Sequence, residues 1–186
     1  MTLKWPQIVL LCIFLYFTSF IVNAGNIRQI SSREGISNNS VLCLSQDKDG
    51  FIWIGTCEGL NLWDGQEMLC YPQEGSGMKA LSGNLIEKIH PTQDGYYWLR
   101  TNYGLDLMDS DKVIEQHKEF QGIYYLLSGN KNETIVITSS GQTFGYCTGS
   151  ASFKEIKLSL TDKFENILGC HTGNGDAIYI LSLIHI

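Results

Sequence analysis

The sequence predicts an all-β fold, and three observations support this prediction. Glycine is frequent and proline is scarce, with 19 glycines and 3 prolines in 186 residues, and there are nine tyrosines, eight phenylalanines and four tryptophans. This composition favours turn-rich antiparallel sheet over helical packing. Short stretches that alternate apolar and polar residues are separated by Asp-Gly and Glu-Gly pairs, which are typical of tight turns. The same arrangement also recurs along the chain, which indicates a repeated structural unit.

The first 24 residues differ in character from the rest and predict a secretory signal peptide at 1–24. Lys4 gives a positive start, the run 8–21 is almost purely apolar, and Ala24 supplies a small residue before the expected cleavage point. The apolar run is shorter than the ~20 residues that a membrane span needs. We therefore expect a leader that is removed after export.

A repeat with a spacing of 45 residues follows the leader. The segment ISNNSVLCLSQDKDGFIWIGTCEGLNLWD, from Ile36, aligns without a gap with LSGNLIEKIHPTQDGYYWLRTNYGLDLMD, from Leu81. The motif residues of the first copy are Asn39, Asp49, Gly50, Trp53, Gly55, Thr56, Gly59 and Leu60. Those of the second copy are Asn84, Asp94, Gly95, Trp98, Thr101, Gly104 and Leu105. We expect all of them to have structural roles in turns and packing.

Two weaker copies extend the repeat. In NETIVITSSGQTFGY, residues 132–146, Thr138 and Gly141 match Thr101 and Gly104, and a further copy begins at NGDAIYI, residues 174–180. Turn residues divide each full copy into four short strands, and four strands in about 45 residues is typical of a β-propeller blade. The sequence predicts a partial β-propeller over residues 25–180, with about three and a half four-stranded blades. Their expected bounds are about 36–75, 81–120, 121–160 and, for the partial blade, 161–180.

The first copy resembles the two-component regulator propeller repeat in its Asn39, its Asp49-Gly50 turn, its Trp53 and its Gly-Leu pair at 59–60. The second copy departs from that repeat with Arg100 where Gly55 stands, and the third has Ile135 in place of the tryptophan.

The resemblance implies the extracytoplasmic sensor region of a hybrid two-component system. It implies an oligosaccharide ligand, a periplasmic location, a full-length protein anchored in the inner membrane, and a histidine kinase that this chain lacks. The partners would be the ligand and the remainder of the same polypeptide, and a homodimer is left open.

The charged residues argue against several other functions. The net charge is −6 and the 13 basic residues form no stripe, so we expect no nucleic-acid contact. The segment 47–50 begins like a calcium loop but lacks the downstream ligands. Asp64, Asp106 and Glu87 are candidate acids for glycoside hydrolysis, which needs two carboxyl groups that face each other. Because the repeat explains Asp64, we expect no catalytic residue, no metal and no cofactor in this chain.

We expect ligand binding where the copies differ, which gives Glu58, Asn102 and Tyr103 as candidates. Tyr103 at a predicted turn offers a ring that could stack on a sugar. His90 and His117, together with His171, lie apart in sequence and are expected to be isolated surface or strand-end residues. Two alternatives stay open: a secreted propeller glycosidase or lyase, and a protein-binding propeller without a signalling role.

Cysteines and the last residues complete the sequence picture. Five cysteines follow the leader without CxxC spacing, so we expect mostly small buried side chains, with one or two disulfides left open. The last six residues, 181–186, read LSLIHI. This is the translation of the transposase mosaic end used in sequencing libraries, and we expect these residues to be a sequencing-adapter artefact.

Overall fold

The computed structural model describes residues 27–71, 79–92, 94–109, 112–122, 124–128, 133–147, 150–157, 167–172 and 178–182, together with Trp5. Apart from Trp5, the predicted signal peptide at 1–24 lies outside the described residues, as do residues 183–186 of the predicted adapter segment. Within the described ranges, no helix has the length and apolar character needed to cross a membrane.

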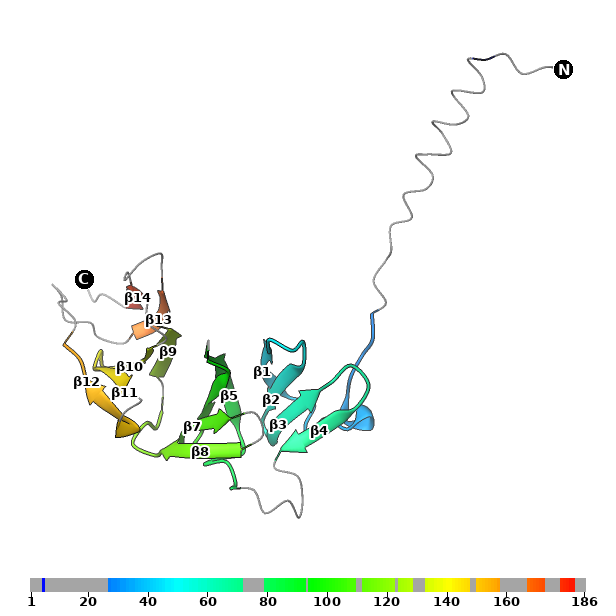
Figure 1. Ribbon diagram of the computed structural model, residues 1–186, viewed down its shortest axis with the longest axis horizontal. Coiled ribbons are helices and arrows are strands. Elements are labelled where there is room, and N and C mark those ends of the chain that lie inside the picture. Colours follow the sequence, from blue (N-terminus) through cyan, green and yellow to red (C-terminus); the bar gives the residue numbers. More distant parts are fainter. Residues whose placement is uncertain are drawn as a thin grey trace.

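The described strands form four antiparallel sheets in which sequence neighbours pair side by side (Figure 1). A short 3-10 helix, η1 (Ser32–Glu34), precedes them. The first sheet contains β1 (Val41–Gln46), β2 (Ile52–Thr56), β3 (Gly59–Trp63) and β4 (Met68–Tyr71). The second contains β5 (Ile86–Pro91), β6 (Tyr96–Thr101), β7 (Gly104–Asp109) and β8 (Lys112–His117). The third contains β9 (Tyr124–Ser128), β10 (Thr134–Thr138), β11 (Thr143–Cys147) and β12 (Ser152–Glu155), and the last pairs β13 (Ile167–Thr172) with β14 (Ile178–Ser182). The predicted all-β class is confirmed.

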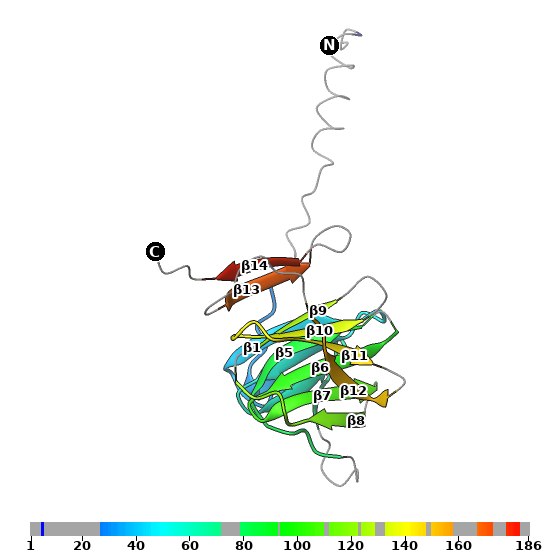
Figure 2. The same cartoon turned by 90° about the vertical axis from the view of Figure 1, so that its left-hand side faces the viewer.

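The sheets follow one another in an arc and stack face against face (Figures 1 and 2). The first strands of successive sheets approach each other, with β1 against β5 and β13 against β9. Four-stranded meanders whose first strands converge in this way are the blades of a β-propeller. The described sheets therefore form part of a propeller, as the repeat predicts.

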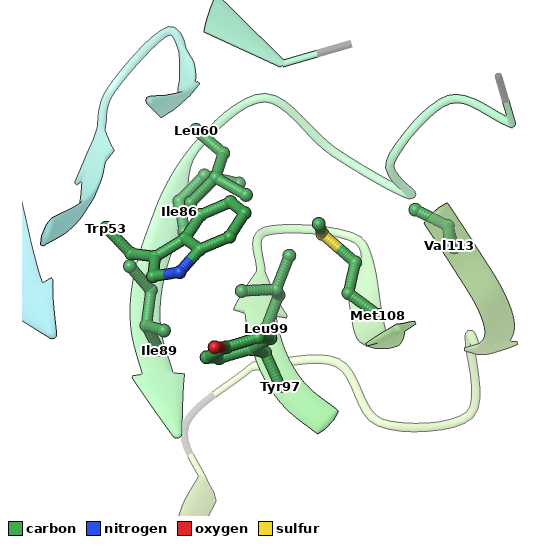
Figure 3. Packing of buried hydrophobic residues seen from close by; sticks show 8 residues of the cluster. All are labelled: Trp53, Leu60, Ile86, Ile89, Tyr97, Leu99, Met108 and Val113. Carbon is green, nitrogen blue, oxygen red and sulfur yellow. The ribbon is translucent and has the colours of Figure 1, made fainter. Parts of the chain in front are cut away.

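The hydrophobic cores lie between the sheets because one small sheet cannot bury both of its faces by itself. Between the first and second sheets, Trp53 of β2 packs against Tyr97 of β6, with ring centroids 5.2 Å apart (Figure 3). Trp98 is 1% exposed and lies in the next core, between the second and third sheets. The residues of the first interface core are Trp53, Leu60, Ile86, Ile89, Tyr97, Leu99, Met108 and Val113. The two motif tryptophans thus fill equivalent positions in successive interfaces.

One side chain organises the turn between β1 and β2. The Asp47 carboxylate accepts hydrogen bonds from the backbone N–H groups of Asp49, at 3.0 Å, and Phe51, at 2.9 Å. Its other oxygen accepts from the indole N–H of Trp53 at 3.1 Å. Gly50 takes a φ of 91°, which favours glycine. The turn between β1 and β2 is therefore built by Asp47, whereas the motif residue Asp49 is exposed.

The motif threonines organise the turn between the second and third strands. The Thr56 hydroxyl donates to the Gly59 carbonyl at 3.0 Å and accepts from the Glu58 N–H at 3.1 Å. Thr101 makes the same two contacts in the second sheet, at 3.1 and 3.2 Å. Both threonines are buried. The two turns are thus local copies of each other.

The third sheet differs at this turn, although Thr138 and Gly141 keep the spacing of the motif. The Thr138 N–H donates to the Gln142 carbonyl at 2.9 Å, and the Thr138 hydroxyl accepts from the Gln142 N–H at 3.1 Å. The loop is therefore one residue longer than the turns at Thr56 and Thr101. Thr138 and Gly141 thus keep the expected spacing in the sequence, but the turn that they form has a different geometry.

Candidate functional site

The three predicted ligand residues lie on equivalent turns of neighbouring sheets. Glu58 lies between β2 and β3, and Asn102 with Tyr103 lies between β6 and β7. Tyr103 is 61% exposed, and the Asn102 side-chain carbonyl accepts from the Leu85 N–H at 3.4 Å. The structure brings Asn102 and Tyr103 together and places Glu58 on the corresponding turn of the first sheet. This arrangement presents one exposed ring beside polar groups.

Two of the candidate acids for hydrolysis, Asp64 and Glu87, stabilise local structure. Asp64 accepts hydrogen bonds from the backbone N–H groups of Gln66, at 2.7 Å, and Glu67, at 2.6 Å, and these bonds lower the pKa of Asp64. Glu87 pairs with the Arg100 guanidinium at 2.6 Å. Both carboxylates are therefore occupied by contacts within their own blades.

The third acid, Asp106, is fully buried and takes the place that Asn61 has in the first sheet. Its carboxylate accepts hydrogen bonds from the backbone N–H of Ser82, at 2.6 Å, and from the Ser82 hydroxyl. Asn61 holds Ser37 in the same way, with the Ser37 N–H at 2.9 Å from its carbonyl oxygen. Burial raises the pKa of Asp106, while its bonds to Ser82 oppose that rise. We assign Asp106 a structural role.

His117 is the last residue of β8, so the strand-end expectation is confirmed, but it is neither isolated nor on the surface, and that part of the expectation was wrong. The ring is buried, with Nε2 3.0 Å from a Glu115 carboxylate oxygen and Nδ1 3.1 Å from a Glu119 oxygen. Glu115 lies on β8 with His117, where alternate residues share one face, and Glu119 lies in the turn that follows the strand, so the spacing Glu-x-His-x-Glu was the signal that sequence reasoning missed. Each ring nitrogen of His117 thus faces a carboxylate.

The other two histidines lie apart from this group. His90 Nε2 is 3.0 Å from the Ser128 hydroxyl, and burial, with the nearby charge of Lys88, lowers the pKa of His90. His171 is exposed on β13. In the part of the chain that the structure describes, no group of three or more His, Cys, Asp or Glu residues is placed to hold a metal ion.

The cysteines after the leader are all free thiols. Cys70 is exposed and the other four are half-buried, so the expectation of mostly buried side chains was wrong. Cys43 and Cys70 lie on β1 and β4, the edge strands of the first sheet, where packing from one side only leaves part of the side chain open. Burial raises the pKa of the Cys43 thiol.

Two cavities flank the His117 group between the second and third sheets. One, of about 160 Å³, is lined by residues of β6, β7, β8, β10 and β11, among them Glu115, Trp98 and Tyr146. The other, of about 210 Å³, is lined by Glu119 with aromatic residues of the third sheet. Each of the two carboxylates that contact His117 thus faces a different cavity. None of the predicted ligand residues Glu58, Asn102 and Tyr103 lines either one.

The fold defines a β-propeller, and solved propeller structures are similar to it. The extracellular domain assigned to the hybrid two component system BT3049 from B. thetaiotaomicron is 19% identical, covers 85% of this chain and aligns with a TM-score of 0.63. The corresponding domain of BT4673 from the same organism is 19% identical, covers 77% and has a TM-score of 0.57. This chain spans 26% and 19% of those two domains. Virginiamycin B lyase from Staphylococcus aureus is 15% identical over 80% of this chain and 50% of its own, with a TM-score of 0.58.

One family is matched at the level of sequence. Residues 35–58 match the family model described as two component regulator propeller. The matched segment includes β1, β2 and the motif residues from Asn39 to Thr56. The resemblance inferred from the sequence is therefore confirmed over residues 35–58. No curated protein sequence matches the chain.

Proposed function

We propose that this chain is part of a periplasmic propeller sensor that belongs to a hybrid two-component system. The proposal rests on one observation, the match of residues 35–58, which include β1 and β2 of the first blade, to the two-component regulator propeller repeat. The likeness in fold to extracellular domains of hybrid two component systems supports it. The sensor binds an oligosaccharide and biases a histidine kinase that lies elsewhere in the same polypeptide. That polypeptide is anchored in the inner membrane.

The turn that carries Asn102 and Tyr103 is the surface we propose for the oligosaccharide. An exposed tyrosine ring offers an apolar face to the C–H groups of a sugar, and neighbouring amide and carboxylate groups pair with its hydroxyls. Tyr103 is 61% exposed and therefore free to stack on a ligand. Glu58 on the equivalent turn of the first sheet supplies the carboxylate.

Calorimetric titration of the exported region with a panel of oligosaccharides tests this function. We expect Tyr103→Ala to weaken binding about ten-fold, the upper range for one aromatic contact, and Tyr103→Phe to retain it. Tyr179→Ala is the matched control, since Tyr179 is 64% exposed on β14. Binding that is equally weakened by both alanine variants would overturn the assignment to the turn. Cleavage of the oligosaccharide would instead support a secreted glycosidase or lyase.

A further inference from the structure

The 160 Å³ cavity between the second and third sheets has walls of an unusual composition. Its rings are Tyr96, Trp98 and Tyr146, and its charged side chains are Asp94 and Glu115. No lysine, arginine or histidine is among its lining residues. The cavity therefore combines aromatic surfaces with two carboxylates and lacks a basic residue on its wall.

The local contacts indicate a negative potential in this cavity. The Tyr146 hydroxyl donates to a Glu115 carboxylate oxygen at 2.7 Å. Burial, the contact with Glu115 and the charge of Asp94 all raise the pKa of Tyr146. The other Glu115 oxygen contacts His117, whose second nitrogen contacts Glu119. Asp94, Glu115 and Glu119 thus give three carboxylates around the cavity, against two basic side chains, His117 and Lys48, whose ammonium group lies near Gly95, so acidic groups remain in excess.

We propose that this cavity binds a small primary amine, with the ammonium group between Asp94 and Glu115. Carboxylates accept the N–H bonds of an ammonium group, and the faces of tryptophan and tyrosine attract a cation. A volume of about 160 Å³ suits a ligand of monosaccharide size or smaller. The same charges disfavour phosphate and carboxylate ligands. This site is separate from the Asn102–Tyr103 turn, so it does not depend on the proposed oligosaccharide function.

D-glucosamine and D-glucose are suitable probes because they share one ring and differ in charge. NMR titration of the ¹⁵N-labelled protein would follow the indole N–H signals of the tryptophans. We expect glucosamine to shift the signal of Trp98, which lines the cavity, and to leave that of Trp53 in the first interface core unchanged. Glucose should shift neither, and added salt should weaken glucosamine binding because the attraction is electrostatic.

The repeat provides a matched pair of variants for this test. Asp94 and Asp49 occupy the same turn position in successive blades, and both are exposed. Removing one charge from the cavity by Asp94→Asn should weaken glucosamine binding about five-fold, and Asp49→Asn should leave it unchanged. Glu115→Gln, which keeps an acceptor for Tyr146, should weaken binding as well. Equal binding of glucose, or no shift of Trp98 in a spectrum that remains dispersed, would overturn the proposal.

Discussion

At the scale of single residues, Asn61 and Asp106 occupy the same buried position in successive blades with different charge. The Asn61 amide donates to the Ser37 hydroxyl at 2.9 Å and to the Ile54 carbonyl at 3.2 Å. An ionised carboxylate cannot donate either bond, and burial without a paired cation disfavours its charge. The raised pKa of Asp106 follows from that burial, which Ser82 offsets only in part.

We therefore expect Asp106→Asn to stabilise the protein at neutral pH. A carboxyl group whose pKa is higher in the folded than in the unfolded state stabilises the fold fully at pH values below its unfolded-state pKa, near 3.8. This contribution is lost as the pH rises through the folded-state pKa. Asparagine does not titrate and keeps the Ser82 contact. The free energy of unfolding should rise by about 1 kcal/mol at pH 7, and by less at pH 4, as measured in urea.

The reverse change in the first blade is the control for this effect. Asn61→Asp replaces the amide group that bonds to Ser37 and to the Ile54 carbonyl with a carboxyl group. It should therefore destabilise the protein more at pH 7 than at pH 4. Equal effects of either variant at both pH values would show that packing, rather than ionisation, decides the stability of this position.

Single residues also show where comparison of the copies was insufficient. Matching by identity selected Asp49 and Asp94, whereas the side chains that organise these turns are Asp47 and Thr92, which accept the equivalent backbone N–H bonds. Asp47 and Thr92 differ in residue type, but each has a side-chain oxygen that accepts a hydrogen bond, so matching by residue identity did not reveal them. His117 was missed for a related reason, because its role depends on neighbours two positions away, Glu115 on β8 and Glu119 in the turn that follows it.

At the scale of strands and sheets, the interfaces between blades satisfy a first-strand carbonyl in different ways. Between the first two sheets, the Cys43 thiol donates to the Ile86 carbonyl at 3.5 Å, beside Gly55. Between the second and third sheets, the Arg100 guanidinium donates to the Tyr124 carbonyl at 2.6 Å. The departure of the second copy from the repeat motif is thus a change of interface chemistry. It is not a sign of a different fold.

The close approach of the first two sheets requires glycine at position 55. A Cβ atom at position 55 would lie 2.4 Å from the Cys43 sulfur and 2.8 Å from the Ile86 carbonyl oxygen. Since the Ile86 carbonyl belongs to the backbone of β5 and cannot move aside as a side chain can, we expect Gly55→Ala to lower the free energy of unfolding by about 2 kcal/mol. Thermal unfolding of the two proteins would measure the loss.

Gly145→Ala is the matched control, because it also adds a methyl group to a glycine within a strand. A Cβ atom at Gly145 on β11 would meet only Ile156 side-chain carbons at 3.7 Å, which is an ordinary contact. We expect little change in the melting temperature of this variant. Equal losses at Gly55 and Gly145 would contradict the requirement for close approach between the first two sheets.

The turns of the first two sheets were predictable because Asp-Gly and Glu-Gly chemistry is local. The longer turn of the third sheet was not, since Thr138-x-x-Gly141 keeps the spacing of the motif. The distinguishing signal is the next residue, which is Leu60 in the first copy and the exposed Gln142 in the third. The longer loop starts the following strand one position later, which keeps its apolar residues on the packed face.

At the scale of the whole molecule, the repeat was sufficient to predict a propeller because its spacing and strand number recur. The cavities were not predictable in the same way. Their walls combine side chains from the second and third sheets, such as Glu115 and Tyr146, that differ between the copies and are distant in sequence. Comparison of repeats identifies what the blades share. A binding cavity depends on what one interface has and the others lack.

The outer faces of the described arc lead to a prediction about association. On β1, Leu42 is 44% and Leu44 is 64% exposed, and on β14 Tyr179 is 64% exposed. We therefore expect molecules of this chain to associate through these faces, because apolar patches and unpaired strand edges favour contact between molecules.

Sedimentation velocity on the purified chain measures this association directly. The double variant Leu44→Lys with Tyr179→Lys should shift the protein toward monomer, since charge on both faces opposes their contact. Ile156→Lys is the control, because Ile156 is 38% exposed and follows β12, away from the two terminal faces. A soluble monomer that melts sharply and cooperatively without any substitution would contradict the prediction. In that case the apolar side chains of β1 and β14 would be tolerated in water at the concentrations used.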